Sequence, residues 1–303
     1  MRRLVALALL LGSLAGQDLT VAAGDARVGP QVVAAVQAMA EDGLRRLARH
    51  FPGAPERPIR VVVHSARDTL PPELREHLHE GTAGFALLGR DEAYVLLAEA
   101  RSEPPNDLRT VVVHELVHVL LDQAAGPAGP FVPRWVHEGL AQELSGGPYL
   151  AVQEEDLVLA VWTRTGPRFS RLVHRFPARD DLRRLAYAQS FSFVAYLVDR
   201  FGVDKIVEAV RRSRADRPFH LALLDVTGLS MARLQDDWEQ YVVFRSGAIA
   251  RFLLRNCFSL VIILAVPLLV IAVVQRSRRN RARMQQLAEE AEEDTAPLGA
   301  DEA

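Results

Sequence analysis

The chain has 303 residues, of which 49% are hydrophobic and 24% are charged, and its formal net charge is -2. This composition excludes a disordered chain, and the length is sufficient to bury one sizeable hydrophobic core or two small ones. The near-neutral charge gives no reason to expect nucleic acid as a partner, because no basic surface of groove size precedes the arginines near the C-terminus.

The N-terminus has the order of a secretory signal peptide. Two arginines at positions 2 and 3 precede an apolar run, and small residues follow that run. We therefore expect residues 1–16 to be a signal peptide and residues 17–250 to form a domain outside the cytoplasm.

Short strand and helix patterns follow in the next part of the chain. β-Branched runs, helical spacing of apolar residues and glycine or proline breaks give the expected elements. They are a helix over 31–51, a strand over 59–65, a brief helix within 71–80 and a β-hairpin over 81–100 that turns at Gly89-Arg90-Asp91. A loop then leads to a helix that Asn106 or Asp107 can cap.

That helix contains the stretch VVVHELVHVLL, residues 111–121, which is apolar on nearly every side. His114, Glu115 and His118 fall on one narrow stripe of the helix. Burying two imidazoles and a carboxylate without partners costs several kcal/mol, so something must coordinate or hydrogen-bond them. Asp122 shares the stripe, and we expect it to be a surface residue at the helix end rather than a partner of a ligand histidine.

Histidines four residues apart on a helix project side by side and can bind one metal ion. His114, Glu115 and His118 form an H-E-x-x-H motif, in which the glutamate acts as the general base on a metal-bound water. A catalytic zinc normally takes three protein ligands. The motif version with a third histidine nearby is absent, because Leu121 and Ala124 occupy the positions of its glycine and histidine. The third ligand must lie further along the chain.

The next helix, WVHEGLAQEL (135–144), offers two candidates for the third ligand, His137 and Glu138. Helical periodicity alone mildly favours His137 as the inward residue, since it falls between Ala141 and Leu144 on the helical wheel. The remainder of the domain predicts further helices, so strands followed by helices indicate an α+β fold. These helices are expected over 152–164, 184–201, 203–213, 217–226 and 230–247.

The C-terminal region predicts a membrane span. Residues 257–274 are uncharged and mostly apolar, about 27 Å as a helix, and the segment 252–274 is long enough to cross a bilayer. Five arginines follow at once and mark the cytoplasmic side. Residues 275–303 are then a cytoplasmic tail, basic first and acidic later, with the acidic part disordered. Cys257 is the only cysteine, so the exported domain has neither a disulfide nor a catalytic thiol.

HELVH followed by PRWVHEGLAQEL, then by LAYAQSFSFVAYLVDRFG (185–202) and GLSMARLQDDWEQYV (228–242), resembles the peptidase MA-like family of gluzincins, distant relatives of thermolysin. The resemblance covers roughly residues 55–245. It implies a zincin-like α+β fold with a small N-terminal mixed sheet followed by a mainly helical part. It also implies a Zn²⁺ cofactor, a peptide or protein substrate, and hydrolysis of peptide bonds by metal-activated water.

The family carries a W-x-x-E-G-x-A pattern whose glutamate is the third zinc ligand. The resemblance therefore implies Glu138 as that ligand, with His114 and His118, and Glu115 as the general base. Gluzincins often take an oxyanion donor from a later helix, and Tyr187 is our candidate. The hairpin before the zinc helix corresponds to the edge strand that aligns substrate, although an ordinary structural hairpin explains the same pattern.

The sequence therefore predicts a single-pass cell-membrane zinc metallopeptidase with an extracytoplasmic catalytic domain. One alternative is a non-catalytic module of the same fold that binds a partner near the membrane, and another is hydrolysis of a non-peptide amide. An intramembrane protease is disfavoured, because about 130 residues separate the motif from the span. Five further histidines are expected to be ordinary surface or core residues: His64, His77, His79, His174 and His220.

Overall fold

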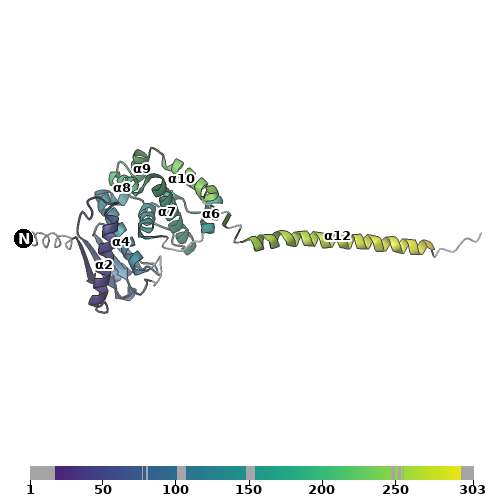
Figure 1. Cartoon of the computed structure of the whole chain (residues 1–303), viewed down its shortest axis with the longest axis horizontal. Coiled ribbons are helices and arrows are strands. Elements are labelled where there is room, and N and C mark those ends of the chain that lie inside the picture. The colour runs from purple at the N-terminus through teal and green to yellow at the C-terminus, as the bar shows by residue number, and fades with distance from the viewer. Residues whose placement is uncertain are drawn as a thin grey trace, which may run out of the picture. The chain divides into compact units, whose positions relative to one another are not determined.

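The computed structural model divides the chain into two units, Met1–Ser246 and Gly247–Ala303 (Figure 1). The residues that it describes are 18–76, 78–79, 81–100, 107–147, 154–245, 247, 250–251, 254 and 256–294. The expected signal peptide, residues 1–16, lies outside the described residues, as does His77.

The first unit contains a mixed sheet, which in the described part of the chain has four strands in the order β1-β2-β4-β3. Their bounds are Leu19–Ala23 (β1), Ile59–His64 (β2), Gly84–Leu87 (β3) and Glu92–Leu96 (β4). β1 and β4 run parallel to β2, and β3 pairs antiparallel with β4 as the predicted hairpin. β2 lies inside the sheet between two parallel neighbours, which explains its nearly continuous apolar sequence.

Helices make up most of the rest of this unit, as the α+β prediction required. Their bounds are Pro30–Leu47 (α2), Pro72–Arg75 (α3), Leu108–Ala125 (α4), Arg134–Ser145 (α5), Glu154–Trp162 (α6), Asp180–Phe201 (α7), Val203–Arg212 (α8), Phe219–Thr227 (α9) and Met231–Gln240 (α10), followed by a π-helical turn, Tyr241–Arg245.

The predicted elements match the structure except in two places. β1 was not predicted, because its five residues, LTVAA, are too short and too mixed to stand out beside the helix that follows. The helix predicted over 230–247 ends as an α-helix at Gln240. Elsewhere the bounds differ by a few residues; for example, α7 begins at Asp180 rather than 184, with two acidic residues in its first turn.

α4 is the central helix of the core. It contacts α2, β3 and β4, and also α5 and α8, which explains why it is apolar on nearly every side. Asp107 caps its N-terminus, as predicted, by accepting a hydrogen bond from the Thr110 N–H at 3.2 Å. The polar side chains in the middle of this helix, His114, Glu115 and His118, are therefore buried inside the domain.

Asp25 joins the end of β1 to the end of β2. Its carboxylate accepts hydrogen bonds from the Ser65 N–H at 2.7 Å and from the Thr69 hydroxyl at 3.0 Å. The Ser65 N–H is the main reason that the pKa of Asp25 falls to about 2. His64 is buried beside this group and contacts Thr69, so it is a core residue as expected.

The second unit contains one long helix, α12, Cys257–Asp294. Among the described residues it is the helix long and apolar enough to cross a membrane, and the apolar side chains described in it are exposed. Pro267 lies inside the helix without ending it. The helix also continues through the arginines into the acidic segment, so the disorder predicted for the acidic tail is wrong up to Asp294.

Candidate metal centre

The structure brings three predicted ligands together from two helices. The Nε2 atoms of His114 and His118 on α4 lie 3.2 Å apart, and Oε2 of Glu138 on α5 lies 3.7 Å from each of them. These ligand atoms all lie within 4.8 Å of one another, and the three side chains are at most 11% exposed. Two imidazoles and one carboxylate form a donor set that suits zinc and leaves a fourth position open. The buried stripe of α4 thus fits a metal ion.

The charge states of these groups also suit a cation. Burial raises the pKa of Glu138, but hydrogen bonds from His114 and His118 outweigh burial and hold this pKa well below its usual range. Burial lowers the pKa of His114, which favours the neutral imidazole that binds metal. For His118 burial acts in the same direction, but Glu138 outweighs it and raises the pKa. A site that attracts a proton in this way also attracts a metal cation.

Glu138 reaches this position because α5 packs closely between α4 and α7. A Cβ atom on Gly139 would lie 2.6 Å from the carbonyl oxygen of Ser190 and 2.4 Å from Cγ2 of Val194, both on α7. Only glycine leaves room for this contact. The glycine that follows the ligand glutamate in the W-x-x-E-G-x-A pattern therefore has a packing role here.

Glu115 lies beside the ligands and has a different environment. Burial raises its pKa to about 8, and its Oε2 atom has no hydrogen-bond partner in the described part of the chain. Strand β3 approaches it closely, since a Cβ atom on Gly84 would lie 2.9 Å from Oε1 of Glu115. The carboxyl group therefore packs against strand β3.

These groups face a cleft of about 390 Å³ between β3, α4 and α5. The cleft brings the predicted oxyanion donor, Tyr187, into the same space as the metal ligands. β3 is one of the two edge strands of the described sheet, as the resemblance implied for a substrate-aligning strand. His79 and His174 also line the cleft, and both are exposed, so they are surface residues as expected.

His137, the alternative third ligand, is outside the group of ligand atoms. Its ring centroid lies 5.8 Å from that of His118, and both of its ring nitrogens are buried without a hydrogen-bond partner among the described residues. Burial lowers its pKa to about 3, so the ring is neutral. The geometry favours Glu138 over His137 because α5 turns the carboxylate, not the imidazole, toward the two histidines.

Arg134 is a site residue that the sequence analysis missed. Its Nη2 atom lies 3.3 Å from Oε1 of Glu138, the oxygen that does not face the histidines, and its guanidinium stacks over Phe176 at 5.4 Å. The Phe176 ring in turn contacts the ring of Tyr187 at 4.8 Å. The i,i+4 spacing of Arg134 and Glu138 was the available signal. Arg134 orients the carboxylate and connects it to the Tyr187 side of the cleft.

The expectation for Asp122 is wrong, because this residue is buried and structural. Its Oδ2 atom accepts a hydrogen bond from the Gly89 N–H at 2.6 Å, and it is only 7% exposed. Asp122 therefore fixes the turn between β3 and β4 onto the end of α4. It positions the edge strand beside the metal ligands without contacting them.

The fold and the donor set define the class: an α+β domain in which a helix with an H-E-x-x-H motif meets a glutamate on the next long helix, and the three side chains could hold a metal ion. A family model described as the peptidase MA superfamily matches residues 39–244, and the chain belongs to this superfamily. The resemblance inferred from the motifs is thus confirmed, and membership supports a peptidase-like function. Comparison with curated proteins and with solved structures finds no match.

Proposed function

We propose that this protein is a membrane-anchored, zinc-dependent peptidase of the gluzincin type. The observation that carries the proposal is the convergence of His114, His118 and Glu138 beside the buried carboxyl group of Glu115. When bound, a zinc ion supplies Lewis-acid chemistry, because it polarises the substrate carbonyl and lowers the pKa of water. A non-catalytic module has no use for a general base in this position.

The residues of this chain divide the remaining work. Glu115 takes a proton from the attacking water and returns it to the leaving amine. Tyr187 donates a hydrogen bond to the oxyanion. Arg134 holds Glu138 in position through Oε1. The free edge of β3 pairs with the substrate main chain, which aligns an extended peptide with little sequence demand.

We further propose that α12 anchors the protein in the membrane and that the arginines after residue 275 lie in the cytoplasm. Residues 1–16 then act as the export signal. Labelling tests this arrangement: in a Cys257→Ser background, Ser277→Cys should react with a membrane-impermeant maleimide only after intact cells are opened. Reaction of Ser277→Cys in intact cells would reverse the orientation.

The first test of the enzyme is the metal content of the full chain in detergent, measured by inductively coupled plasma mass spectrometry. We expect about one zinc per chain, lost in Glu138→Ala and retained in His137→Ala. Cleavage of a mixed peptide library is then compared between the parent and Glu115→Gln. Zinc binding without any peptide cleavage would favour a binding module or a non-peptide amide substrate, and absence of zinc after reconstitution would refute the proposal.

A further inference from the structure

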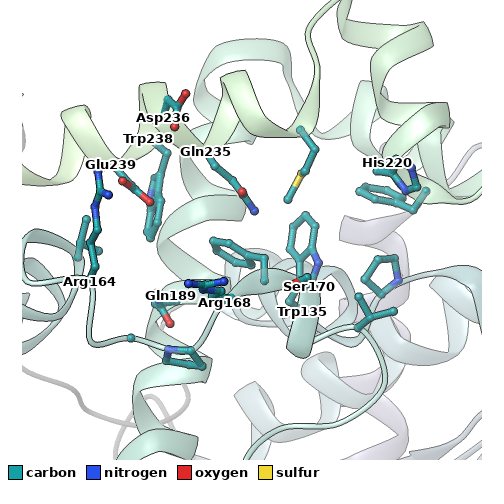
Figure 2. A pocket seen from close by; sticks show the side chains of 18 of the residues that line it. Trp135, Arg164, Arg168, Ser170, Gln189, His220, Gln235, Asp236, Trp238 and Glu239 are labelled. Atoms are coloured by element: carbon teal, nitrogen blue, oxygen red, sulfur yellow. The ribbon is translucent and has the colours of Figure 1, made fainter.

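A second cavity, of about 700 Å³, lies beside the first turn of α5, where Trp135 lines it (Figure 2). Helices α5, α7, α9 and α10 contribute to it, together with the segment between α6 and α7. Figure 2 shows Gln235 and Trp238 extending from α10 toward Arg168 and Gln189. Its volume is within the range that holds a ligand of drug or short-peptide size.

Buried aromatic rings form one wall of this cavity. Trp135, Phe169 and Trp238 are each at most 7% exposed. Their rings form a connected cluster, with centroids 5.2 Å apart for the first pair and 5.6 Å for Phe169 and Trp238. Such a wall binds a bulky apolar or aromatic group, since rings in contact add geometric preference to the burial of apolar surface.

A buried amide without a partner lies against this wall. Gln189 is 6% exposed, and its Oε1 atom has no hydrogen-bond partner in the part of the chain that the structure describes. By contrast, the Trp238 indole N–H is satisfied, because it donates to the Ser192 hydroxyl at 3.1 Å. Buried polar groups are normally hydrogen-bonded, so the Gln189 amide indicates a ligand that supplies a donor.

The hydrogen-bonding groups of a primary amide limit the chemical class of ligand that the cavity can bind. A glutamine side chain offers one acceptor and two donors, which complement the N–H and C=O of a peptide unit. Gly166 packs closely against this amide, since a Cβ atom there would lie 2.7 Å from Nε2 of Gln189. The charged residues of the lining, Arg164, Arg168, Asp236 and Glu239, balance in sign, so the cavity has no preference for an anion or a cation.

The cavity and the catalytic cleft share a wall. Val173 lines both, and its carbonyl oxygen accepts a hydrogen bond from the Arg134 N–H at 2.7 Å. Arg134 lines the cleft, whereas the next residue, Trp135, lines the cavity. A peptide held in the cavity therefore lies close to the cleft in which the proposed chemistry takes place.

We propose that this cavity is a docking subsite for an uncharged, extended segment of the peptide substrate. A bulky apolar side chain of the segment packs on Trp135, Phe169 and Trp238, and a main-chain amide pairs with Gln189. The assignment of the segment to the substrate rests on the proposed peptidase function. The binding itself does not, and it is measured without turnover.

The test uses N-acetyl-L-phenylalaninamide, a neutral molecule with two amides and one aromatic ring, as the probe. The protein is the full chain in detergent with Glu115→Gln and Trp162→Phe. Of the three tryptophans, those that remain, Trp135 and Trp238, line the cavity. We expect saturable changes in tryptophan emission with the probe, and at least fivefold weaker binding in Gln189→Leu, which keeps the side-chain volume but removes the amide.

Matched controls separate the site from general effects. Arg171→Gln changes an exposed neighbour outside the cavity and should bind as the parent does. N-acetylglycinamide, which lacks the ring, should give no saturable change. If Gln189→Leu does not fold, Gly166→Ala displaces the same amide and should weaken binding instead.

Three results overturn the proposal: no saturable binding of the probe, equal affinity in Gln189→Leu, or tighter binding of phenylacetate than of the amide, which would indicate an anion site. Binding that depends on Gln189 in a protein that cleaves no peptide would retain the peptide subsite and refute the peptidase. Peptide cleavage without probe binding would retain the peptidase and refute the peptide subsite.

Discussion

Two sides of one helix turn differ in how their polar groups are satisfied. Around α5, the metal side carries Arg134 and Glu138, whose charges pair with each other and with the histidines of α4. The cavity side carries Trp135 among aromatic rings, and nearby Oε1 of Gln189 has no hydrogen-bond partner among the described residues. The metal side therefore suits a small cation, and the cavity side suits the larger, neutral and partly apolar molecule that we propose for it.

The largest effect on activity is expected from Glu115→Gln, which should remove most of the catalytic activity of the metal side and leave the cavity side unchanged. Removing a general base typically lowers turnover by about 10²- to 10⁴-fold. Peptide hydrolysis should fall by this factor while zinc content stays unchanged, because Glu115 is not in the ligand group. Binding of the probe in the aromatic cavity should also be unchanged. Turnover equal to that of the parent would remove Glu115 from the mechanism.

Gly139→Ala should disturb both sides at once. The added methyl group would meet the backbone of α7 at 2.6 Å, so we expect a loss of about 3 kcal/mol in the free energy of unfolding, at the upper end for overpacking. Urea unfolding measures this loss. The control is Gly29→Ala, where nothing lies within 4 Å, and it should change stability little. If Gly139→Ala is as stable as the control, the close packing of α5 on α7 is not required.

Arg134→Gln should affect the metal side alone. Loss of the partner of Oε1 frees the Glu138 carboxylate to rotate, and partners of ligand residues typically contribute about 10- to 100-fold to metal affinity. Competition with a zinc chelator measures the change. Probe binding at Trp135 should stay constant, although the two residues are adjacent in sequence. Weaker binding on both sides would mean that the first turn of α5 had moved.

The smallest effect is expected at Asp25, remote from α5. Folding lowers the pKa of this carboxyl group from 3.8 to about 2. Its contribution to the stability of the fold is therefore present above pH 3.8 and is lost as the pH falls toward about 2. Asp25→Asn should therefore lower the melting temperature at neutral pH, with the difference from the parent shrinking between pH 3.8 and about 2. A difference that is independent of pH would contradict this account.

The local sequence was sufficient to predict a site or an element where residues of a particular chemistry recurred at a regular spacing. The H-E-x-x-H spacing predicted that His114 and His118 face one point, because residues four apart on a helix always lie side by side. Element positions followed from breakers and apolar spacing, with bounds that shift by a few residues. β1 was not predicted, because such a short strand is defined by its pairing with a neighbour, here β2, rather than by a pattern in its own sequence.

Other residues could not be assigned from the sequence, since their roles depend on contacts across the fold. Periodicity within α5 favoured His137, yet the crossing of α5 and α4 presents Glu138. Asp122 was expected at the surface, but it binds the Gly89 N–H of the hairpin turn. Arg134, His79 and His174 belong to the cleft only because α5, α7 and the sheet meet there.

The sequence by itself determined the family, the α+β class, the motif histidines with their glutamate, and an apolar helix near the C-terminus. The family and the class depend on the order of motifs and elements along the chain, and the motif and the apolar helix depend on spacing within a single helix, so none of them needs contacts across the fold. The tertiary structure alone decided which residue of α5 completes the ligand group and which glycines permit close packing. It also decided that the first turn of α5 borders both the candidate metal centre and the aromatic cavity, because side-chain direction between elements follows from how they pack.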